Sequence, residues 1–229
     1  MPNEIISYLE MCQREGVSLQ RGMNFQLTGG HSVILMSVRP NAPYADRVED
    51  DGATVIYEGH DVPQTAQTSD PKAVDQAAFT ASGKLTENGK FHKAAQAHKL
   101  QGAPPERVRV YEKIKEGIWS YNGVFHLVDS WQTESDGRHV FKFKLVAVEG
   151  EEDFDRPVPR NPKPRRIIPT FVKLAVWQRD GGKCTICGVT EDLHFDHILP
   201  FSRGGASNTA DNIQLLCGRH NIQKHDKIQ

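Results

Sequence analysis

Cysteine, tryptophan and long apolar runs are all scarce in this chain of 229 residues. It has four cysteines and three tryptophans, and 38% of its residues are hydrophobic against 25% that are charged. No apolar run approaches the roughly 20 residues that a transmembrane helix needs. The acidic N-terminal segment lacks the apolar core of a secretory signal peptide. These absences predict a soluble intracellular protein of one or two domains that has no membrane partner.

Three of the four cysteines lie close together near the C-terminus. Cys184 and Cys187 form a C-x-x-C pair, and Cys217 and His220 form a matching C-x-x-H pair. Two such spacings in one short stretch favour a tetrahedral zinc site over disulfides. Because four protein ligands leave no coordination position open, the zinc is expected to be structural. Buried thiols without a metal are the less favoured alternative.

Basic charge is concentrated in a proline-rich segment. Residues 151–229 hold 12 Lys and Arg against 10 Asp and Glu, whereas residues 1–150 hold 16 against 19. Four prolines between residues 157 and 164 favour an extended spacer. We therefore predict a first domain over 1–150, a basic linker over 151–168 and a second domain over 169–229. The linker suits contact with DNA phosphates, and a solvated spacer is the alternative.

The apolar patterns predict strands in most of the first half. A helix is expected over residues 4–14, strands over 31–40 and 53–57, and a helix over 94–100. Further strands are expected over 106–114, 123–133 and 138–148, with a turn at Asp136-Gly137 between the last two. Strands with few helices and no repeated βαβ pattern predict a curved, mostly antiparallel sheet or barrel. A helix is expected again from Pro169 to about Asp180.

The residues between and after the two ligand pairs carry the chemistry. Asp196-His197 and Asn212 lie between the pairs, and Asn221 follows directly. With the ligand pairs, they make the stretch Cys184–Lys224 resemble the catalytic unit of the HNH nucleases, two short strands and a helix around a metal ion. An imidazole titrates near neutral pH, so His197 suits a general base. The resemblance implies that Asp196 and Asn221 bind a catalytic Mg²⁺ or Mn²⁺ and that Asn212 holds the loop bearing the base.

Two histidines near the second pair have alternative assignments. His220 serves zinc if the second pair mirrors the first, whereas other HNH proteins use a His near this position for the catalytic metal. We assign His220 to zinc because of the symmetry of the two pairs. His225 follows Asn221 by four residues and could face the same ion. Contact of His225 with phosphate or solvent is the favoured alternative.

Two tyrosines in the first half stand in a recognisable context. Tyr44 and Tyr57 lie in NAPYADRVEDDGATVIYEGHD, which is followed by KLTENGKFHKAA and RVRVYEKIKEGIWSYNGVFHLVDSW. Over roughly residues 20–148 this half resembles the SRA (SET- and RING-associated, or YDG) domain, a crescent-shaped β-barrel that flips 5-methylcytosine into a pocket. The resemblance implies that Tyr44 and Tyr57 sandwich the base and that Asp46 accepts from the cytosine amino group. Glu58 and Asp61 are candidates for the pocket edge.

The physical requirements of such a pocket agree with these residue types. A flipped base needs aromatic faces for stacking and an acceptor for its amino group. The alternative is that both tyrosines are ordinary strand aromatics. The namesake Tyr-Asp-Gly of the family stands here as Tyr121-Asn122-Gly123.

Together these features predict an α+β chain. It would join an N-terminal SRA-like curved β-barrel with flanking helices to a small C-terminal zinc-braced ββα-metal (HNH) domain. The favoured function is a modification-dependent, type IV-like DNA endonuclease in the cytoplasm of a prokaryotic-type cell. It would recognise 5-methylcytosine or 5-hydroxymethylcytosine in double-stranded DNA and cut nearby as a homodimer, because one HNH site cuts one strand. An HNH nicking nuclease and a non-cleaving DNA reader are the alternatives.

Overall fold

The fold is built on a strongly curved sheet. The structure is a computed structural model that describes residues 2–66, 68–148, 167–200 and 204–224. The strands are β1 (Glu4–Ile6), β2 (Met23–Asn24), β3 (Ser32–Met36), β4 (Arg47–Glu49), β5 (Thr54–Glu58), β6 (Glu106–Lys115), β7 (Ile118–Ser135), β8 (Arg138–Ala147), β9 (Leu193–His197) and β10 (Ile213–Cys217). The helices are α1 (Tyr8–Glu15), α2 (Glu87–Gln101), α3 (Thr170–Arg179) and α4 (Gly218–Lys224), with 3-10 turns η1 (Asp50–Gly52), η2 (Pro71–Ala73) and η4 (Ala210–Asn212).

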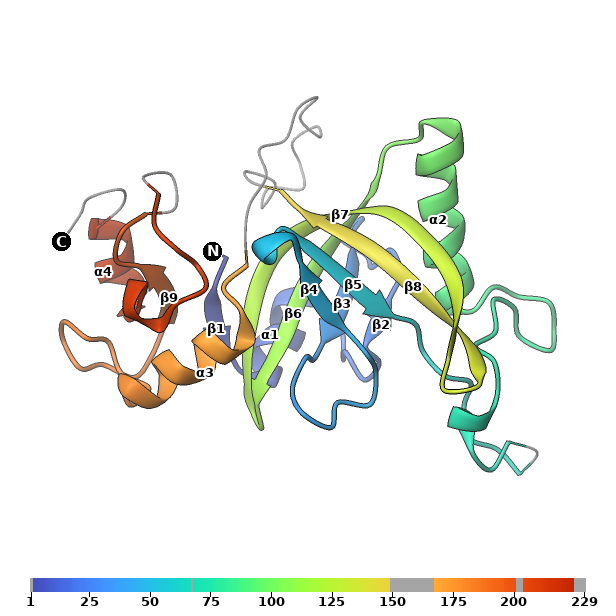
Figure 1. The fold of residues 1–229 in the computed structure, drawn as a ribbon, viewed down its shortest axis with the longest axis horizontal. Helices are drawn as coiled ribbons and strands as arrows, with labels where there is room; N and C mark the ends of the chain where they lie inside the picture. The colour runs from blue at the N-terminus through green and yellow to red at the C-terminus, as the bar shows by residue number, and fades with distance from the viewer. Residues whose placement is uncertain (1, 67, 149–166, 201–203, 225–229) are drawn as a thin grey trace.

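The strand pairing leaves the sheet open. Hydrogen bonds connect the larger part in the order β2-β3-β6-β7-β8-β5-β4, and only β3 and β6 run parallel. No pairing among the described strands joins β2 to β4. The predicted α+β class is confirmed, and the barrel expected from the resemblance is a curved sheet that does not close. Figure 1 shows its curvature and α2 packed at one end.

The helix ends explain where the sequence-based boundaries were wrong. Ser7 accepts from the backbone N–H of Glu10, whose side chain accepts from the backbone N–H of Ser7, so this capping box starts α1 at residue 8. Residues 4–6, expected as helix, pair instead with β7. Thr86 caps α2, so this helix begins at Glu87 and not at residue 94 as predicted.

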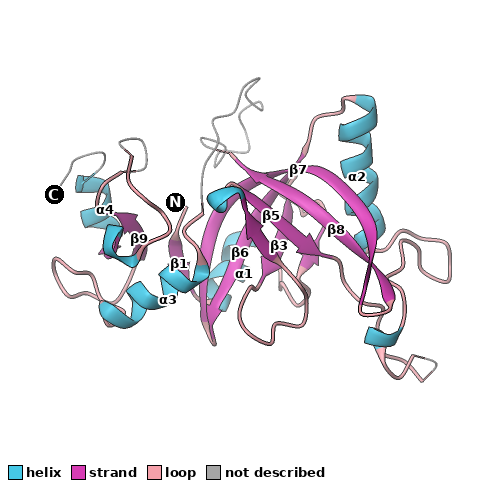
Figure 2. Ribbon diagram, in the orientation of Figure 1, coloured by secondary structure: helices cyan, strands magenta, loops and turns pink. Residues whose placement is uncertain are grey.

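The C-terminal part forms a second, smaller core. Strands β9 and β10 pair antiparallel, and α3 and α4 pack around them. Figure 2 shows α3 and α4 beside β9. The buried residues of this core are Ile168, Val172, Val176, Cys184, Leu193, Phe195, Ile213, Leu215, Leu216 and Cys217. A buried β-hairpin with flanking helices agrees with the expected module.

Some expectations fall outside the described residues. Residues 151–166 of the proposed linker and His225 are among them. The two linker residues that are described, Ile167 and Ile168, are buried. The division at residues 150 and 168 stays a prediction. Within the described ranges, every helix falls short of the length and apolarity that a bilayer crossing requires.

Candidate metal centre, active site and tyrosine pocket

The four predicted zinc ligands meet at one point. The ligand atoms of Cys184, Cys187, Cys217 and His220 all lie within 4.8 Å of one another. The Nδ1 atom of His220 is 3.4 Å from the sulfur of Cys184 and 3.3 Å from that of Cys217. The Cys187 and Cys217 sulfurs are 3.9 Å apart. These separations match the edges of a tetrahedron around zinc, where metal–sulfur bonds are about 2.3 Å.

Local backbone structure prepares these thiols for a metal. The backbone N–H of Gly188 donates to the carbonyl of Cys184 at 2.8 Å, and Gly188 has φ +76°, a conformation that favours glycine. Burial raises the pKa of the Cys184 thiol, but the backbone N–H groups of Cys217, Cys187 and Ile186 outweigh it and bring the pKa to about 6. Thiolate is the form that binds zinc. The residue set therefore fits a structural Zn²⁺ ion.

The predicted catalytic pair ends β9. Asp196 lies opposite Gln214 of β10, whose side-chain amide donates to the Asp196 Oδ2 atom at 3.3 Å. The Lys224 ammonium donates to the same oxygen at 2.5 Å and also to the His197 carbonyl. The Lys224 side chain is 1% exposed. A buried ammonium thus compensates the Asp196 charge on one oxygen, and the described residues make no hydrogen bond to the other.

His197 is held through one ring nitrogen. Its Nε2 atom lies 2.9 Å from the hydroxyl of the buried Ser207. Burial lowers the pKa of His197, an effect that the Asp196 carboxylate opposes and Lys224 reinforces. The described residues make no hydrogen bond to Nδ1. The ring is therefore fixed at one end, and its other nitrogen remains for chemistry.

Asn212 ties together the loop that follows β9. Its side-chain carbonyl accepts from the backbone N–H of Leu199 at 2.8 Å. Its amide donates to the carbonyls of Leu199 at 3.0 Å and Ala206 at 2.9 Å. A Cβ added to Gly205 would lie 1.8 Å from the Leu199 carbonyl, so only glycine fits that close approach. Asn212 thus holds both ends of the loop between His197 and Ser207.

Helix α4 brings the remaining predicted residues to the same region. Asn221 is half-buried on α4, three residues before Lys224 and one after the zinc-cluster residue His220. Residues three apart share a helix face, so Asn221 and Lys224 face the same side. No role was predicted for Lys224 or Ser207. The spacing of Lys224 after Asn221 was an available signal, whereas nothing local marked Ser207.

A cavity in the N-terminal sheet contains the predicted aromatic residues. It has a volume of about 550 Å³, and its walls include Tyr44, Asp46, Tyr57 and His60. We call these four residues the tyrosine pocket. The backbone of Gly22 closes one side, because a Cβ there would lie 2.7 Å from the His60 Nε2 atom and 2.8 Å from the Tyr57 hydroxyl.

His60 lies on Tyr44 within the tyrosine pocket. The two rings are stacked with centroids 5.2 Å apart, and His60 Nε2 is 2.9 Å from the Tyr57 hydroxyl. The backbone of His60 donates to and accepts from the side-chain amide of Asn88, both at 2.8 Å. Burial lowers the pKa of His60 to about 4, so the imidazole is neutral at neutral pH. Sequence analysis did not include His60.

Asp46 forms the polar end of the pocket. Its oxygens accept from the backbone N–H groups of Ser37 and Glu58, each at 3.0 Å. Burial raises the pKa of Asp46 to about 7 although both hydrogen bonds lower it. A carboxyl group with this pKa exists in both protonation states near neutral pH. It can therefore accept a hydrogen bond when ionised and donate one when protonated.

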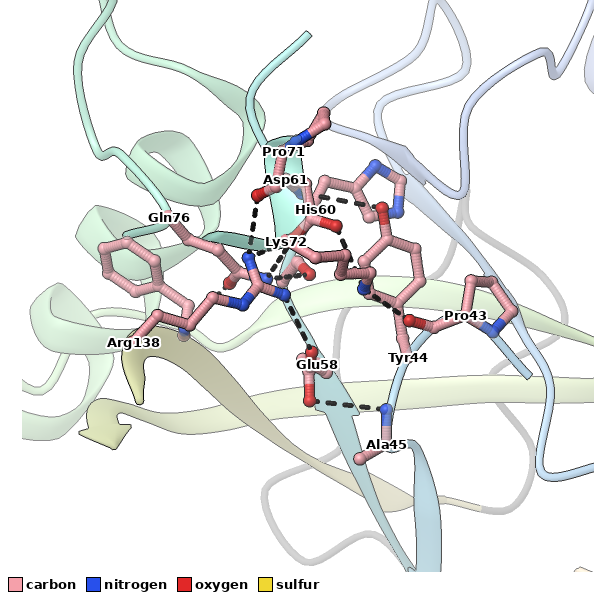
Figure 3. Close-up of polar contacts among 12 residues, drawn as sticks. Pro43, Tyr44, Ala45, Glu58, His60, Asp61, Pro71, Lys72, Gln76 and Arg138 are labelled. Carbon is pink, nitrogen blue, oxygen red and sulfur yellow. Dashed lines mark hydrogen bonds and ion pairs between the residues drawn. The ribbon is translucent and has the colours of Figure 1, made fainter. Parts of the chain in front are cut away.

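Glu58 and Asp61 lie beside the pocket and are paired with cations. Glu58 accepts from the Lys142 ammonium at 2.7 Å, and Asp61 accepts from the Arg138 guanidinium at 2.6 Å. The Lys72 ammonium contacts Asp61 at 2.9 Å and lies 4.1 Å from the centroid of the Tyr44 ring. Figure 3 shows Asp61, Lys72 and Arg138 beside Tyr44 and His60. Neither Glu58 nor Asp61 is among the residues that line the cavity.

The structure joins a C-terminal module that holds a Cys3His cluster to a curved sheet with an aromatic pocket. Residues 184–227 match the family described as HNH endonuclease. The C-terminal module is therefore an HNH endonuclease domain, and the chain joins it to a domain that is similar to SRA domains.

Known proteins resemble larger parts of the chain. The Arabidopsis thaliana protein "Histone-lysine N-methyltransferase family member SUVH2" is 25% identical over 203 residues, which cover 80% of this chain and 30% of that protein. The chain thus spans less than a third of this relative. The SUVH5 SRA domain in complex with hemi-methylated CG DNA has a TM-score of 0.43 at 24% identity, covering 63% of this chain and 86% of that one. The modification-dependent TagI restriction endonuclease has a TM-score of 0.45 at 17% identity, covering 97% and 76%.

Proposed function

We propose that this protein is a modification-dependent DNA endonuclease. The tyrosine pocket would bind a flipped 5-methylcytosine or 5-hydroxymethylcytosine, and the HNH module would hydrolyse a nearby phosphodiester. One observation carries the proposal. The same chain holds a cavity walled by Tyr44, Tyr57 and a buried carboxyl group, and an HNH module whose histidine keeps one ring nitrogen available.

The pocket has the groups that base recognition requires. A flipped pyrimidine needs an aromatic face and an acceptor for its exocyclic amino group. Tyr44 supplies a face, Asp46 an acceptor, and Tyr57 a fully buried wall. In the free protein His60 covers Tyr44. We propose that the base takes the place of the His60 imidazole on the Tyr44 ring.

The active site would work by general-base hydrolysis. His197 Nδ1 takes the proton of the attacking water while Ser207 holds the opposite side of the ring. Asp196 and Asn221 would hold Mg²⁺ or Mn²⁺, for which the oxygen of Asp196 that is not bonded to Lys224 is suited. Such an ion stabilises the negative charge that develops on the leaving oxygen. The zinc ion at the cysteines has a structural role only.

Double-strand cleavage would require two copies of the chain. Each chain has one Asp196-His197 pair. One such site acts on one strand at a time, and two-fold dimers are the commonest assembly of soluble proteins. We therefore propose that a homodimer makes the double-strand break. Simultaneous cutting of both strands by a species that is monomeric on DNA would exclude this.

The test compares three duplexes of identical sequence. They carry a single 5-methylcytosine, 5-hydroxymethylcytosine or plain cytosine, and each is incubated with Mg²⁺ or Mn²⁺ at one salt concentration, because phosphate contacts depend on salt. We expect cleavage of modified DNA, none of plain DNA, and none by His197→Ala. Equal cleavage of all three duplexes would indicate an HNH nuclease without base reading. Selective binding without cleavage by the wild type would indicate a non-cleaving reader.

A further inference from the structure

The short strand β1 joins the two parts of the molecule by backbone hydrogen bonds. On one edge, Glu4 lies opposite Tyr121 of β7, and the backbone N–H of Asn3 donates to the Tyr121 carbonyl at 2.7 Å. On the other edge, Glu4 lies opposite His194 of β9, and the backbone N–H of Phe195 donates to the Asn3 carbonyl at 3.0 Å. Figure 1 shows β1 between β9 and the curved sheet. The strand that ends in Asp196-His197 is thus continuous with the sheet of the tyrosine pocket.

A buried ion pair forms a second attachment. Lys173 of α3 donates to Glu112 of β6 at 2.7 Å and to the side-chain carbonyl of Asn122 of β7 at 2.6 Å. The side chains of Lys173 and Glu112 are 0% and 1% exposed. Asn122 also donates to Glu112 at 3.0 Å, and the Thr170 hydroxyl donates to the other Glu112 oxygen. The first helix of the C-terminal part is therefore bound to the large sheet through a polar cluster without access to water.

Two consecutive isoleucines form a third attachment. Ile167 is packed in the core of the curved sheet, and its backbone N–H donates to the Gly52 carbonyl at 2.7 Å. Ile168 is packed in the core of the HNH module. The chain thus passes from one core to the other within a single peptide unit. Because no flexible residues separate Ile167 from Ile168, the chain at this point restricts any separation of the two cores.

The chemistry of the polar cluster determines what it can do. An apolar contact tolerates sliding, because the hydrophobic effect has no direction. A buried ion pair tolerates little, because displacement leaves charges without partners in a medium of low dielectric constant. The usual expectation for domains joined by a linker is relative motion. Three attachments from β1, α3 and residues 167–168 oppose that motion here.

We infer that Lys173 and Glu112 are positioning residues that hold the HNH active site at one fixed placement relative to the tyrosine pocket. The cut then falls at a set distance from the modified cytosine. The statement about the cutting distance rests on the proposed function. The rigidity of the junction does not depend on it. Base binding and hydrolysis use other residues, so the cluster acts on where the strand is cut and not on whether it is cut.

The test removes both charges together. Glu112→Gln with Lys173→Met removes both charges of this pair together. The Gln carbonyl can still accept from the Asn122 amide, and the Gln amide can donate to the Thr170 hydroxyl, so the variant is expected to fold. The matched control is Asp129→Asn with Lys99→Met. That pair also joins a helix to a strand, α2 to β7, but it lies within the N-terminal domain and its side chains are 28% and 50% exposed.

Two measurements report separately on rigidity and on cutting. Nitroxides on non-canonical side chains at the exposed Leu100 of α2 and Gln223 of α4 give the distance distribution between the two parts without DNA, and they leave the cysteines unlabelled. The second measurement maps cuts on a duplex with one modified cytosine. We expect one narrow distance and one cutting position for the wild type and the control. The double variant Glu112→Gln with Lys173→Met should give a broad distance distribution and scattered cuts at an unchanged melting temperature.

The outcomes separate the inference from the proposed function. A broad or two-peaked distance distribution in the wild type overturns the rigid junction, whatever the enzyme cuts. A broadened variant that keeps a single cutting position also overturns the inference, because DNA would then set the distance. A wild type that is narrow but cuts no modified DNA leaves the rigidity standing and rejects the proposed function. Should the variant fail to fold, the wild-type distance distribution still decides whether the junction is rigid.

Discussion

The imidazole of His60 lies parallel to the phenol ring of Tyr44, with centroids 5.2 Å apart and ring planes inclined by 10°. A base cannot fit between rings in direct contact, so His60 occupies the face that a flipped cytosine would use. The ring centroids of His60 and Tyr57 are 6.2 Å apart, so His60 contacts both tyrosines. Displacement of His60 would then be part of base recognition.

Replacing Tyr44 and His60 by alanine should have opposite effects. Tyr44→Ala removes a stacking contact of about 1–3 kcal/mol, so the ratio of affinities for modified and plain duplexes should fall towards one. His60→Ala removes a group that the base must displace, so this ratio should stay or rise. Tyr44→Phe keeps the ring and serves as the control. The measurement is equilibrium binding at one salt concentration, and a ratio that falls equally in His60→Ala would mean that His60 itself stacks on the base.

Tyr57 requires a different substitution. It is 1% exposed, so Tyr57→Ala would open a core cavity and mix packing with recognition. Tyr57→Phe keeps the wall and removes the hydroxyl that lies 2.9 Å from His60 Nε2. His60 is then freer to leave Tyr44, and the affinity for modified DNA should rise up to a few-fold, as expected for one hydrogen bond of about 1 kcal/mol. Weaker binding in this variant would assign the hydroxyl to the base.

His60 and Asp46 should change the free energy of unfolding with pH in opposite directions. The pKa of His60 is lowered to about 4 from its ordinary 6.5, so between these values the unfolded chain binds more protons and this group makes stability rise with pH. The pKa of Asp46 is raised to about 7 from 3.8, so the folded chain binds more protons and this group makes stability fall as pH rises. The two slopes oppose each other in the wild type.

When either group is removed by substitution, the pH dependence of stability that the other group causes should become measurable. Relative to the wild type, the free energy of unfolding of His60→Gln should fall as pH rises from about 4 to 6.5, because the rise due to the imidazole is lost. Relative to the wild type, that of Asp46→Asn should rise from pH 3.8 to about 7, because the fall due to the carboxyl group is lost. Urea unfolding across the range measures both. Parallel wild-type and His60→Gln curves would mean that the imidazole is not buried as described.

The sequence predicted the elements that local patterns specify. The spacing of Cys184, Cys187, Cys217 and His220 predicted a cluster that the structure assembles. The turn at Asp136-Gly137 joins β7 and β8 as expected, with both residues at positive φ. These features depend on a few neighbouring residues, which is why they could be predicted.

Features that depend on tertiary contacts were missed. The three residues of β1 have an apolar pattern as suitable for a helix as for a strand, and pairing on both edges decides between them. His60 lies next to the predicted Asp61, but only its stacking on Tyr44 shows that it belongs to the pocket. The contact between Lys224 and Asp196 joins α4 to β9, and the spacing of Lys224 after Asn221 could not show that its ammonium reaches Asp196.

Loss of one thiolate should release zinc and destabilise the HNH module. Cys184→Ser removes one of four ligands and a buried residue of the module's core. Zinc-dependent folding of such small modules predicts that metal content falls from about one per chain to near zero and that melting shifts to lower temperature. Cys12→Ser is the matched control, because Cys12 lies outside the cluster. Full zinc content and native melting in Cys184→Ser would disprove the zinc assignment.

The contact between His197 and Ser207 should control the rate of cleavage without affecting DNA binding. When the Ser207 hydroxyl accepts a hydrogen bond from the Nε2–H group of neutral His197, the lone pair of the ring is on Nδ1 and is available to water. His197→Ala should lower the cleavage rate about 10²–10⁴-fold, the usual contribution of a general base. Ser207→Ala frees the ring to rotate, and misplacement of this kind costs up to about 100-fold. Ser207→Thr keeps the hydroxyl and should restore most of the rate.

Single-turnover cleavage of modified DNA measures these rates, and binding measured without divalent metal provides the check on affinity. Affinity should stay within a few-fold of wild type in all three variants, because neither residue is proposed to dock the DNA. If Ser207→Ala and Ser207→Thr lose activity equally, the hydroxyl does not orient the ring and the loop shape alone matters. If His197→Ala retains cleavage within a few-fold of wild type, the general base must be another group. The assignment of His220 to zinc, and not to the catalytic metal, would then be the first to re-examine.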